Sequence, residues 1–226
     1  MRTLCVVPLL LVAGCATAGP VVRLLPRDGD VVWHSGRAVI TRQSPELEIA
    51  AAFDRQEGDR LAFRLEVQNL GLPRVDLDSS AVTYQRCRPD GQCTQWWRVP
   101  DPEQAIVGLD VRQRNEQAAA TNAETAGTAL ILLDLFGSRR HSHVAADAVA
   151  TQSAADGHRN QAADADAERA QWESAALRRT TLFPSQGTAG AVYLPVDPNT
   201  TSITLRVVIA GQTFLFPFNQ TTLGNG

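Results

Sequence analysis

One change of composition most constrains how this chain can fold. Between residues 101 and 177, 20 of the 77 residues are Ala, and no Pro follows Pro102 in that segment. Alanine is the strongest helix former and proline interrupts helices, so we expect this segment to be helical. The segments on either side have a strand-like pattern. The sequence therefore predicts a β domain that a helical insertion interrupts.

The strand-like pattern is clearest over Leu61–Val67, where large apolar residues alternate with Ala62, Arg64 and Glu66. A period of two residues is typical of a strand with one buried face. Turn residues at Pro89-Asp90-Gly91 and at Ala210-Gly211-Gln212 predict two hairpins. Counting both flanking segments, we expect about eight short strands, which favours a sandwich over a parallel sheet.

Asp101-Pro102-Glu103 predicts the start of a helix, with an N-cap residue followed by Pro at the first helical position. The composition predicts one helix over Glu116–Phe136, a break at Gly137-Ser138, and a second helix over Asp164–Leu177. The simplest arrangement is a helical hairpin or a small bundle.

The N-terminus has the pattern of a secretory signal peptide. Met1-Arg2 precedes an apolar run from Leu4 to Val12, and Ala13-Gly14-Cys15 follows. These residues resemble the lipobox of bacterial lipoproteins. The resemblance implies that residues 1–14 are removed and that Cys15 carries lipid. Because Ala16 rather than Asp follows Cys15, the resemblance to sorted lipoproteins further implies the outer membrane of a bacterial envelope.

A wider resemblance covers most of the mature chain. The lipobox, an Asn69-Leu70-Gly71 turn, the Ala-rich insertion and Leu177–Leu182 occur in the order seen in a group of uncharacterised bacterial lipoproteins. That group implies a mainly β (α+β) fold, an Ig-like antiparallel β-sandwich with an inserted helical hairpin, and it implies no activity. The expected organisation is a lipidated tether at residues 15–30, the sandwich at 31–100 and 178–220, the insertion at 101–177, and a flexible tail at 221–226.

Two cysteines remain after Cys5 and Cys15 are assigned to the signal peptide and the lipid. Cys87 and Cys93 flank the Pro89-Asp90-Gly91 turn. The two strands that leave this turn would bring the cysteines together, so we expect a disulfide in an oxidising periplasm. Such a short loop would contribute about 2 kcal/mol in the chain-entropy model. The alternative, a two-cysteine metal site, has no histidine nearby.

Charge separates the insertion from the rest of the chain. Residues 101–177 contain 12 Asp and Glu against 6 Arg, a net charge of −6, and the remaining mature chain has 12 acids against 14 Arg, a net charge of +2. The negative charge of the insertion has two possible explanations. It could be a solvated helical face, or a surface that repels nucleic acid and lipid head groups but can bind a basic partner. All 21 basic residues counted as Lys and Arg are Arg, which excludes lysine Schiff-base chemistry.

Candidate chemistry is sparse. His141, His143, Asp147 and His158 could supply metal ligands, but their spacing matches no zinc motif, and a polar linker between helices explains them too. Asp76 and Asp78 share a strand face and could do acid–base work, bind calcium, or simply end a strand in solvent. We therefore assign no catalytic residue, no metal and no cofactor.

Two places could bind a partner. One of the adjacent Trp96 and Trp97 should point outward, and we select Trp97 as the candidate anchor. The run Thr128–Phe136 is apolar nearly all round, so Leu130, Leu133 and Phe136 must be covered by the insertion, the sandwich, a partner chain or the bilayer interface.

These observations predict a lipid-anchored, non-enzymatic envelope protein that binds a partner protein or supports an envelope assembly. Two alternatives stay open. One is an envelope hydrolase that acts on peptidoglycan or glycan through carboxylates such as Asp76 and Asp78. The other is a carrier of an amphiphilic ligand, with residues 130–136 lining its pocket.

Overall fold

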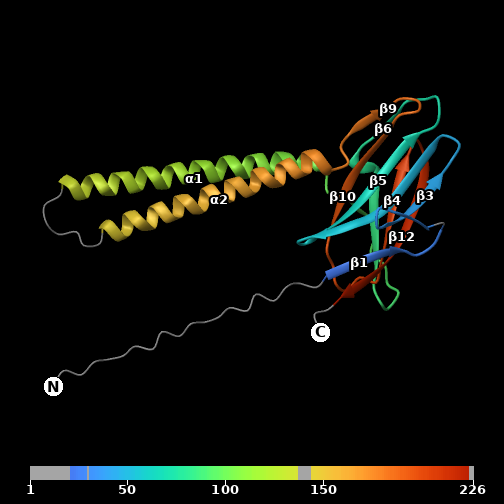
Figure 1. The fold of residues 1–226 in the computed structure, drawn as a ribbon, viewed down its shortest axis with the longest axis horizontal. Helices are drawn as coiled ribbons and strands as arrows, with labels where there is room; N and C mark the ends of the chain where they lie inside the picture. The colour runs from blue at the N-terminus through green and yellow to red at the C-terminus, as the bar shows by residue number, and fades with distance from the viewer. Residues whose placement is uncertain (1–20, 30, 137–143, 224–226) are drawn as a thin grey trace, which may run out of the picture.

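The computed structural model describes residues 21–29, 31–136 and 144–223. They form a mainly β structure from which two long helices extend side by side (Figure 1). The helices lie between strands in chain order, which confirms an α+β sandwich with an inserted helical hairpin. The elements, in chain order, are β1 (Val21–Pro26), β2 (Val31–His34), β3 (Arg37–Gln43), β4 (Leu47–Glu57), β5 (Arg60–Asn69), β6 (Val75–Leu77), the 3-10 helix η1 (Ser79–Ala81), β7 (Val82–Cys87), β8 (Trp97–Arg98), α1 (Pro102–Phe136), α2 (Val144–Ala175), β9 (Thr180–Leu182), β10 (Gly187–Pro195), β11 (Ser202–Ile209) and β12 (Gln212–Leu223).

The strands form two five-stranded antiparallel sheets and one small pair. The first sheet, called sheet A here, has the order β1-β12-β11-β7-β8. The second, sheet B, has the order β10-β5-β4-β3-β2, and β6 pairs with β9. The runs β12-β11-β7 and β10-β5-β4 reproduce the orders G-F-C and E-B-A of an immunoglobulin sandwich. In that scheme α1, α2 and β9 occupy the chain between strands C and E.

The main core lies between sheets A and B. The alternating residues expected from the period of two supply it: Leu61, Phe63, Leu65 and Val67 of β5 are all fully buried. The ring of Phe63 meets that of Phe218 of β12 edge-on, with 5.1 Å between the ring centroids. Phe214, Phe216 and Phe218 are buried on one face of β12, as their spacing predicts.

Several boundaries differ from the sequence-based expectation. Residues 21–26, expected in the tether, form β1, which pairs with residues 218–223 of β12. For the same reason β12 continues into the expected tail as far as Leu223. Twelve strands are present in the described part of the chain, where about eight were expected. The additional strands include β1, which lies in the expected tether, and β2 and β3, which precede the alternating pattern that begins at Leu47.

The second helix is also much longer than expected. It begins at Val144 rather than Asp164, so residues 144–163, which we had interpreted as part of a polar linker, belong to α2. Small and polar residues dominate that stretch and weaken its apolar periodicity. Pairing with α1 supplies the partner surface that the isolated sequence lacks.

Candidate functional site

The helical hairpin is the feature that most distinguishes this molecule from a simple sandwich. Its 35-residue α1 would measure about 50 Å at 1.5 Å per residue. Asp101 caps the start of α1, as predicted: its carboxylate accepts a hydrogen bond from the backbone N–H of Glu103 at 3.0 Å. Both helices point away from the sandwich (Figure 1). A surface at the far end of the hairpin is therefore held well away from the sheets.

The two helices meet along a seam with a heptad spacing. In α1 the residues at positions 106, 109, 113, 116, 120, 123, 127 and 130 are all buried or half-buried, and so are those at positions 148, 151, 155, 158, 162, 165, 169 and 172 of α2. Spacings of three and four residues that alternate in this way are typical of coiled coils. The hairpin is thus an antiparallel helical pair with a continuous inner face.

Small residues bring the two helices close together. Ala120, Ala155, Ala162 and Ala165 are buried in the seam. A Cβ atom on Gly127 would lie only 2.7 Å from the Oγ1 atom of Thr151, so this position needs glycine for the observed spacing. An alanine seam buries little apolar area per residue, and helix propensity must supply a large share of the stability.

A hydrophobic contact joins the base of the hairpin to the outer face of sheet B. Ile106 and Leu109 of α1 and Trp172 of α2 pack with Ala62 of β5 and Tyr193 of β10. The rings of Trp172 and Tyr193 lie 4.6 Å apart, and burial raises the pKa of the Tyr193 hydroxyl. Ala62 and Tyr193 point away from the main core, so the helices cover a part of the sheet that would otherwise face solvent.

Polar contacts reinforce the same base. The guanidinium of Arg60 of β5 lies 5.5 Å from the centroid of the Trp172 ring and 2.5 Å from the carboxylate of Glu168. The side chain of Gln171 donates a hydrogen bond to Glu57 of β4. These contacts fix the direction of α2 against strands β4 and β5.

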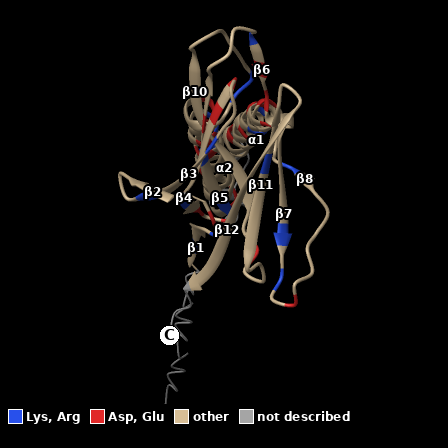
Figure 2. Ribbon diagram, turned by 90° about the vertical axis from the view of Figure 1, so that its right-hand side faces the viewer, with Lys and Arg blue, Asp and Glu red and all other residues tan. Residues whose placement is uncertain are grey.

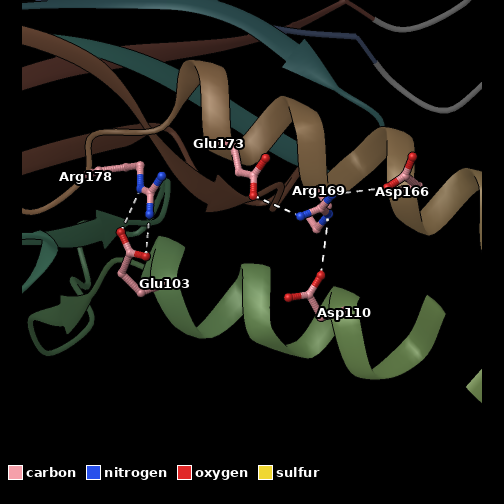
Figure 3. A network of polar contacts seen from close by, with 6 residues as sticks. All are labelled: Glu103, Asp110, Asp166, Arg169, Glu173 and Arg178. Atoms are coloured by element: carbon pink, nitrogen blue, oxygen red, sulfur yellow. Dashed lines mark hydrogen bonds and ion pairs between the residues drawn. The ribbon is translucent and has the colours of Figure 1, made fainter. Parts of the chain in front are cut away.

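Two groups of ion pairs connect the helices to each other and to the strap, the segment 176–179 between α2 and β9 (Figure 3). Arg178, just after α2, donates two hydrogen bonds to Glu103 of α1, at 2.8 and 2.7 Å. These bonds hold the pKa of the Glu103 carboxyl below its usual value. Further along, Arg169 lies 3.4 Å from Asp110 of α1 and 3.1 Å from Glu173 of its own helix.

The strap that returns from α2 to the sandwich is also fixed. The backbone N–H of Leu177 donates a hydrogen bond to the carbonyl of Ala191 at 2.8 Å, and the Leu177 side chain is buried in the main core. A Cβ atom on Gly190 would lie 2.5 Å from the Cα atom of Leu177. Glycine at this position lets the strap pass against β10. The hairpin base is thus fixed by apolar packing, ion pairs and backbone contacts together.

The far end of the hairpin carries exposed apolar side chains. Ile131 and Leu132 of α1 are 52% and 48% exposed, and Val149 of α2 is 69% exposed. Leu130 is half-buried at a seam position. The side chains of Leu133 and Phe136, also predicted as a partner surface, lie outside the described part of the structure. Of the surfaces that were expected to cover this apolar segment, α2 covers Leu130. It leaves the neighbouring Ile131 and Leu132 exposed.

The histidines and acids proposed as metal ligands do not assemble in the described part of the chain. His141 and His143 lie outside it, and Asp147 is exposed on α2. His158 lies in the seam, where its Nδ1 atom is 2.7 Å from the carboxylate of Glu116. No group of three or more His, Cys, Asp or Glu side chains could hold a metal among residues 21–29, 31–136 and 144–223.

The candidate catalytic carboxylates have local structural partners. Asp76 is exposed between buried Val75 and Leu77 of β6, and Asp78 follows this strand at the start of η1. Thr181 of β9 donates a hydrogen bond to Asp76 at 2.6 Å. The Asp78 carboxylate caps η1 and accepts a 2.7 Å bond from the backbone of Ser80, and hydrogen bonds from Ser80 lower its pKa. Both carboxylates therefore stabilise the β6–η1 region.

The cysteine turn forms as predicted. Cys87 and Cys93 are joined by a disulfide, and β7 pairs with β8 around it. Trp97 stands opposite buried Tyr84 in the strand pairing, and its ring meets that of Tyr84 edge-on with 5.9 Å between the ring centroids. Trp96 takes the other side of the chain, on the outer face of sheet A. Trp97, the candidate anchor chosen from the sequence, is 41% exposed, whereas Trp96 is half-buried.

Trp97 is also far from the other predicted partner residues, since β8 belongs to sheet A and Leu130 to the distal half of α1. Cys15, the proposed lipidation site, lies outside the described residues. None of the described helices is long and apolar enough to cross a membrane. No protein-family model, curated protein or solved structure matches the chain.

Proposed function

We propose that this chain is a lipid-anchored, non-enzymatic bacterial envelope protein that binds a partner protein through the distal half of its helical hairpin. The observation that carries the proposal is the combination of a fixed base with exposed apolar side chains at the far end. Ile131, Leu132 and Val149 are exposed on a hairpin whose inner face is closed in its distal half mainly by small residues such as Ala120, Gly127 and Ala155. Apolar side chains that the fold leaves in solvent are characteristic of interaction surfaces.

The proposed anchor adds a geometric argument. Only six positions separate Cys15 from Val21, the first residue of β1. Six extended residues span at most about 20 Å, whereas the hairpin is about 50 Å long. Lipid on Cys15 would therefore keep the sandwich close to the membrane, and the hairpin could reach a partner that the sandwich itself cannot meet.

Charge supports a protein partner rather than a lipid surface for the hairpin. The insertion has a net charge of −6, and anionic head groups would repel it. The same charge would attract a partner with a basic rim around an apolar centre, which is the usual anatomy of an interface.

The test compares two positions on one helix. Ile131→Ser with Leu132→Ser changes the distal end, whereas Val107→Ser with Val111→Ser changes two exposed residues near the base, at 61% and 52% exposure. A photo-crosslinker is placed at Gln152 of α2 in each full-length variant, expressed in its own envelope. We expect the wild-type chain and the base variant to give the same discrete crosslinked species, and the distal variant to lose it.

Equal crosslinking by both variants would overturn the assignment of the distal half as the binding surface. A chain in which residues 104–174 are replaced by a short Gly-Ser linker, with the photo-crosslinker placed on the sandwich instead, provides the second control. If that chain still recovers the same partner, the sandwich rather than the hairpin is the binding element.

A further inference from the structure

The outer face of sheet A has a charge pattern opposite to that of the hairpin. The five strands of sheet A contain Arg23, Arg86, Arg98 and Arg206 and no Asp or Glu. Figure 2 shows β11 and β12 without acidic positions, while acidic positions recur along the helices behind them. Arg86 is buried, but Arg23, Arg98 and Arg206 alternate with core residues and belong to the outer face.

An aromatic ring lies at the centre of this face. The guanidinium of Arg206 of β11 lies 4.3 Å from the centroid of the Trp96 ring. The Nε atom of Arg206 donates a hydrogen bond to Thr83 of β7 at 3.0 Å, which fixes the guanidinium. Arg206, fixed by Thr83 of the neighbouring strand, thus packs against one face of the indole. The half-buried ring of Trp96 also lines a groove.

The groove has a volume of about 720 Å³ and extends from Trp96 toward the edge of β12. Strand β1 pairs with residues 218–223 of β12, so residues 212–217 border the groove instead. Most of its lining is uncharged and polar. The amide and hydroxyl side chains that line it are Gln43, Ser44, Gln85, Thr204, Gln212 and Thr213.

The charged residues of the groove favour an anion. Arg27 and Arg42 line it together with Asp28, which lies 3.6 Å from Arg42. The side-chain amide of Gln212, which lines the groove, donates a hydrogen bond to the carboxylate of Glu46 at 3.2 Å. Two guanidinium groups and one carboxylate thus line the groove, and Arg206 lies beside it at Trp96. Arg is well suited to bind a carboxylate through two parallel bonds.

We propose that this groove binds an anionic glycan, a saccharide chain that carries carboxylates. The apolar face of a sugar ring would stack on Trp96, sugar hydroxyls would exchange hydrogen bonds with Gln85, Gln43 and Thr204, and Arg27 and Arg42 would bind the carboxylate. A groove of this volume accommodates two or three sugar rings. The combination of Trp96 with an uncharged polar lining favours a glycan over an acidic peptide, because a sugar ring offers an apolar face to the indole and hydroxyls to the amide side chains.

The experiment uses the full-length protein in detergent and two matched probes. One is a tetrasaccharide of alternating N-acetylglucosamine and N-acetylmuramic acid, and the other is chitotetraose, which lacks the lactyl carboxylates. Isothermal titration calorimetry at low salt should give binding of the carboxylate-bearing probe about tenfold tighter than that of chitotetraose. Binding should weaken as salt is raised, because the arginines are partly exposed.

Variants locate the site. Trp96→Ala and Arg42→Gln should each weaken binding of the carboxylate-bearing probe by about tenfold. Trp33→Ala is the matched control, since Trp33 is 66% exposed on β2, in the other sheet, and its loss should leave binding unchanged. Because Trp96→Ala alters a packed ring, the indole N–H of Trp96 is also followed by NMR in the wild-type protein, where it should shift on titration.

Three results would overturn the proposal. Equal affinity for the two tetrasaccharides would remove the role of the carboxylate. Binding that survives in both Trp96→Ala and Arg42→Gln would place the glycan elsewhere. Absence of glycan binding together with salt-dependent binding of poly-glutamate would assign the groove to an acidic protein segment instead.

Discussion

The sandwich and the hairpin are stabilised in different ways. Large side chains fill the sandwich: Phe63, Phe216 and Phe218 are fully buried between two sheets, each of which combines strands from both sides of the insertion. Alanines fill the hairpin seam, and its two helices are adjacent in sequence. Burial of apolar area therefore dominates in the sandwich, and local helix propensity dominates in the hairpin. The comparison shows that one chain can join a core that depends on long-range contacts to an arm that depends mainly on local ones.

The largest effect should come from a deletion in the sandwich core. Phe63 is fully buried and meets the rings of Phe53 and Phe218 at 5.6 and 5.1 Å. Phe63→Ala should lower the free energy of unfolding by about 3–5 kcal/mol, because it removes a large apolar surface and leaves a cavity. Urea denaturation followed by tryptophan fluorescence measures the change. A loss below 1 kcal/mol would mean that the sheets close around the missing ring.

The disulfide should have the next largest effect, also confined to the sandwich. Cys87→Ser with Cys93→Ser should reduce the free energy of unfolding by about 2 kcal/mol, because the reduced chain loses a constraint on its unfolded state. Urea denaturation of the variant is compared with that of the oxidised wild-type protein, and the wild-type protein in reductant should match the variant. Amide exchange in α1 and α2 should stay unchanged, and faster exchange in the helices would contradict the separation of the two regions.

A change in helix propensity should affect only the hairpin. Gly157 of α2 has open space where a Cβ atom would be placed, so Gly157→Ala should stabilise the helix by about 1 kcal/mol. Gly127→Ala is the matched control, because its Cβ atom would collide with Thr151 and offset the same gain. Amide exchange should slow in α2 of the first variant, whereas exchange in α1 of the second should not slow. Equal slowing would show that the seam can open to admit a methyl group.

The smallest effect concerns the ion pair at the hairpin base. Arg178 holds the pKa of Glu103 below its usual value, so the pair stabilises the base when Glu103 is ionised. The contribution is complete above the unfolded pKa of about 4.3 and is lost as the pH falls through the lower folded value. Amide exchange at the first turn of α1 should therefore quicken below that pH. Glu103→Gln should remove the pH dependence of exchange, and its persistence in that variant would exclude this pair.

The interface between the two regions was the hardest part to predict. Ala62, Arg60 and Tyr193 looked like ordinary outward residues of two strands, yet they support Trp172 and Glu168 of α2. The α2 partners of Arg60 and Ala62 lie more than a hundred residues away in sequence, and Trp172 lies 21 residues before Tyr193, so no local pattern connects them. Ala62, an outward alanine opposite a tyrosine, is a weak signal that the outer face is covered at that point.

The tryptophan pair illustrates the same limit. Adjacent strand residues must point to opposite sides, and the sequence establishes this much for Trp96 and Trp97. Which of them faces outward depends on the register of β8 against β7, where Trp97 stands opposite Tyr84. A shift of one residue in register would exchange their roles. The groove beside Trp96 therefore could not be located before the register was known.

The sequence by itself determined the local features of this protein. Alternation over residues 61–67, the turn between Cys87 and Cys93, the capped start at Asp101 and the Ala-rich insertion all depend on neighbouring residues. Only the tertiary structure decided the full length of α2, the strand formed by residues 21–26, the contact of Trp172 with Tyr193 and the groove lined by Arg42 and Trp96. Each of these requires a partner surface from a distant part of the chain, and the free energy that stabilises it appears only when both surfaces are folded.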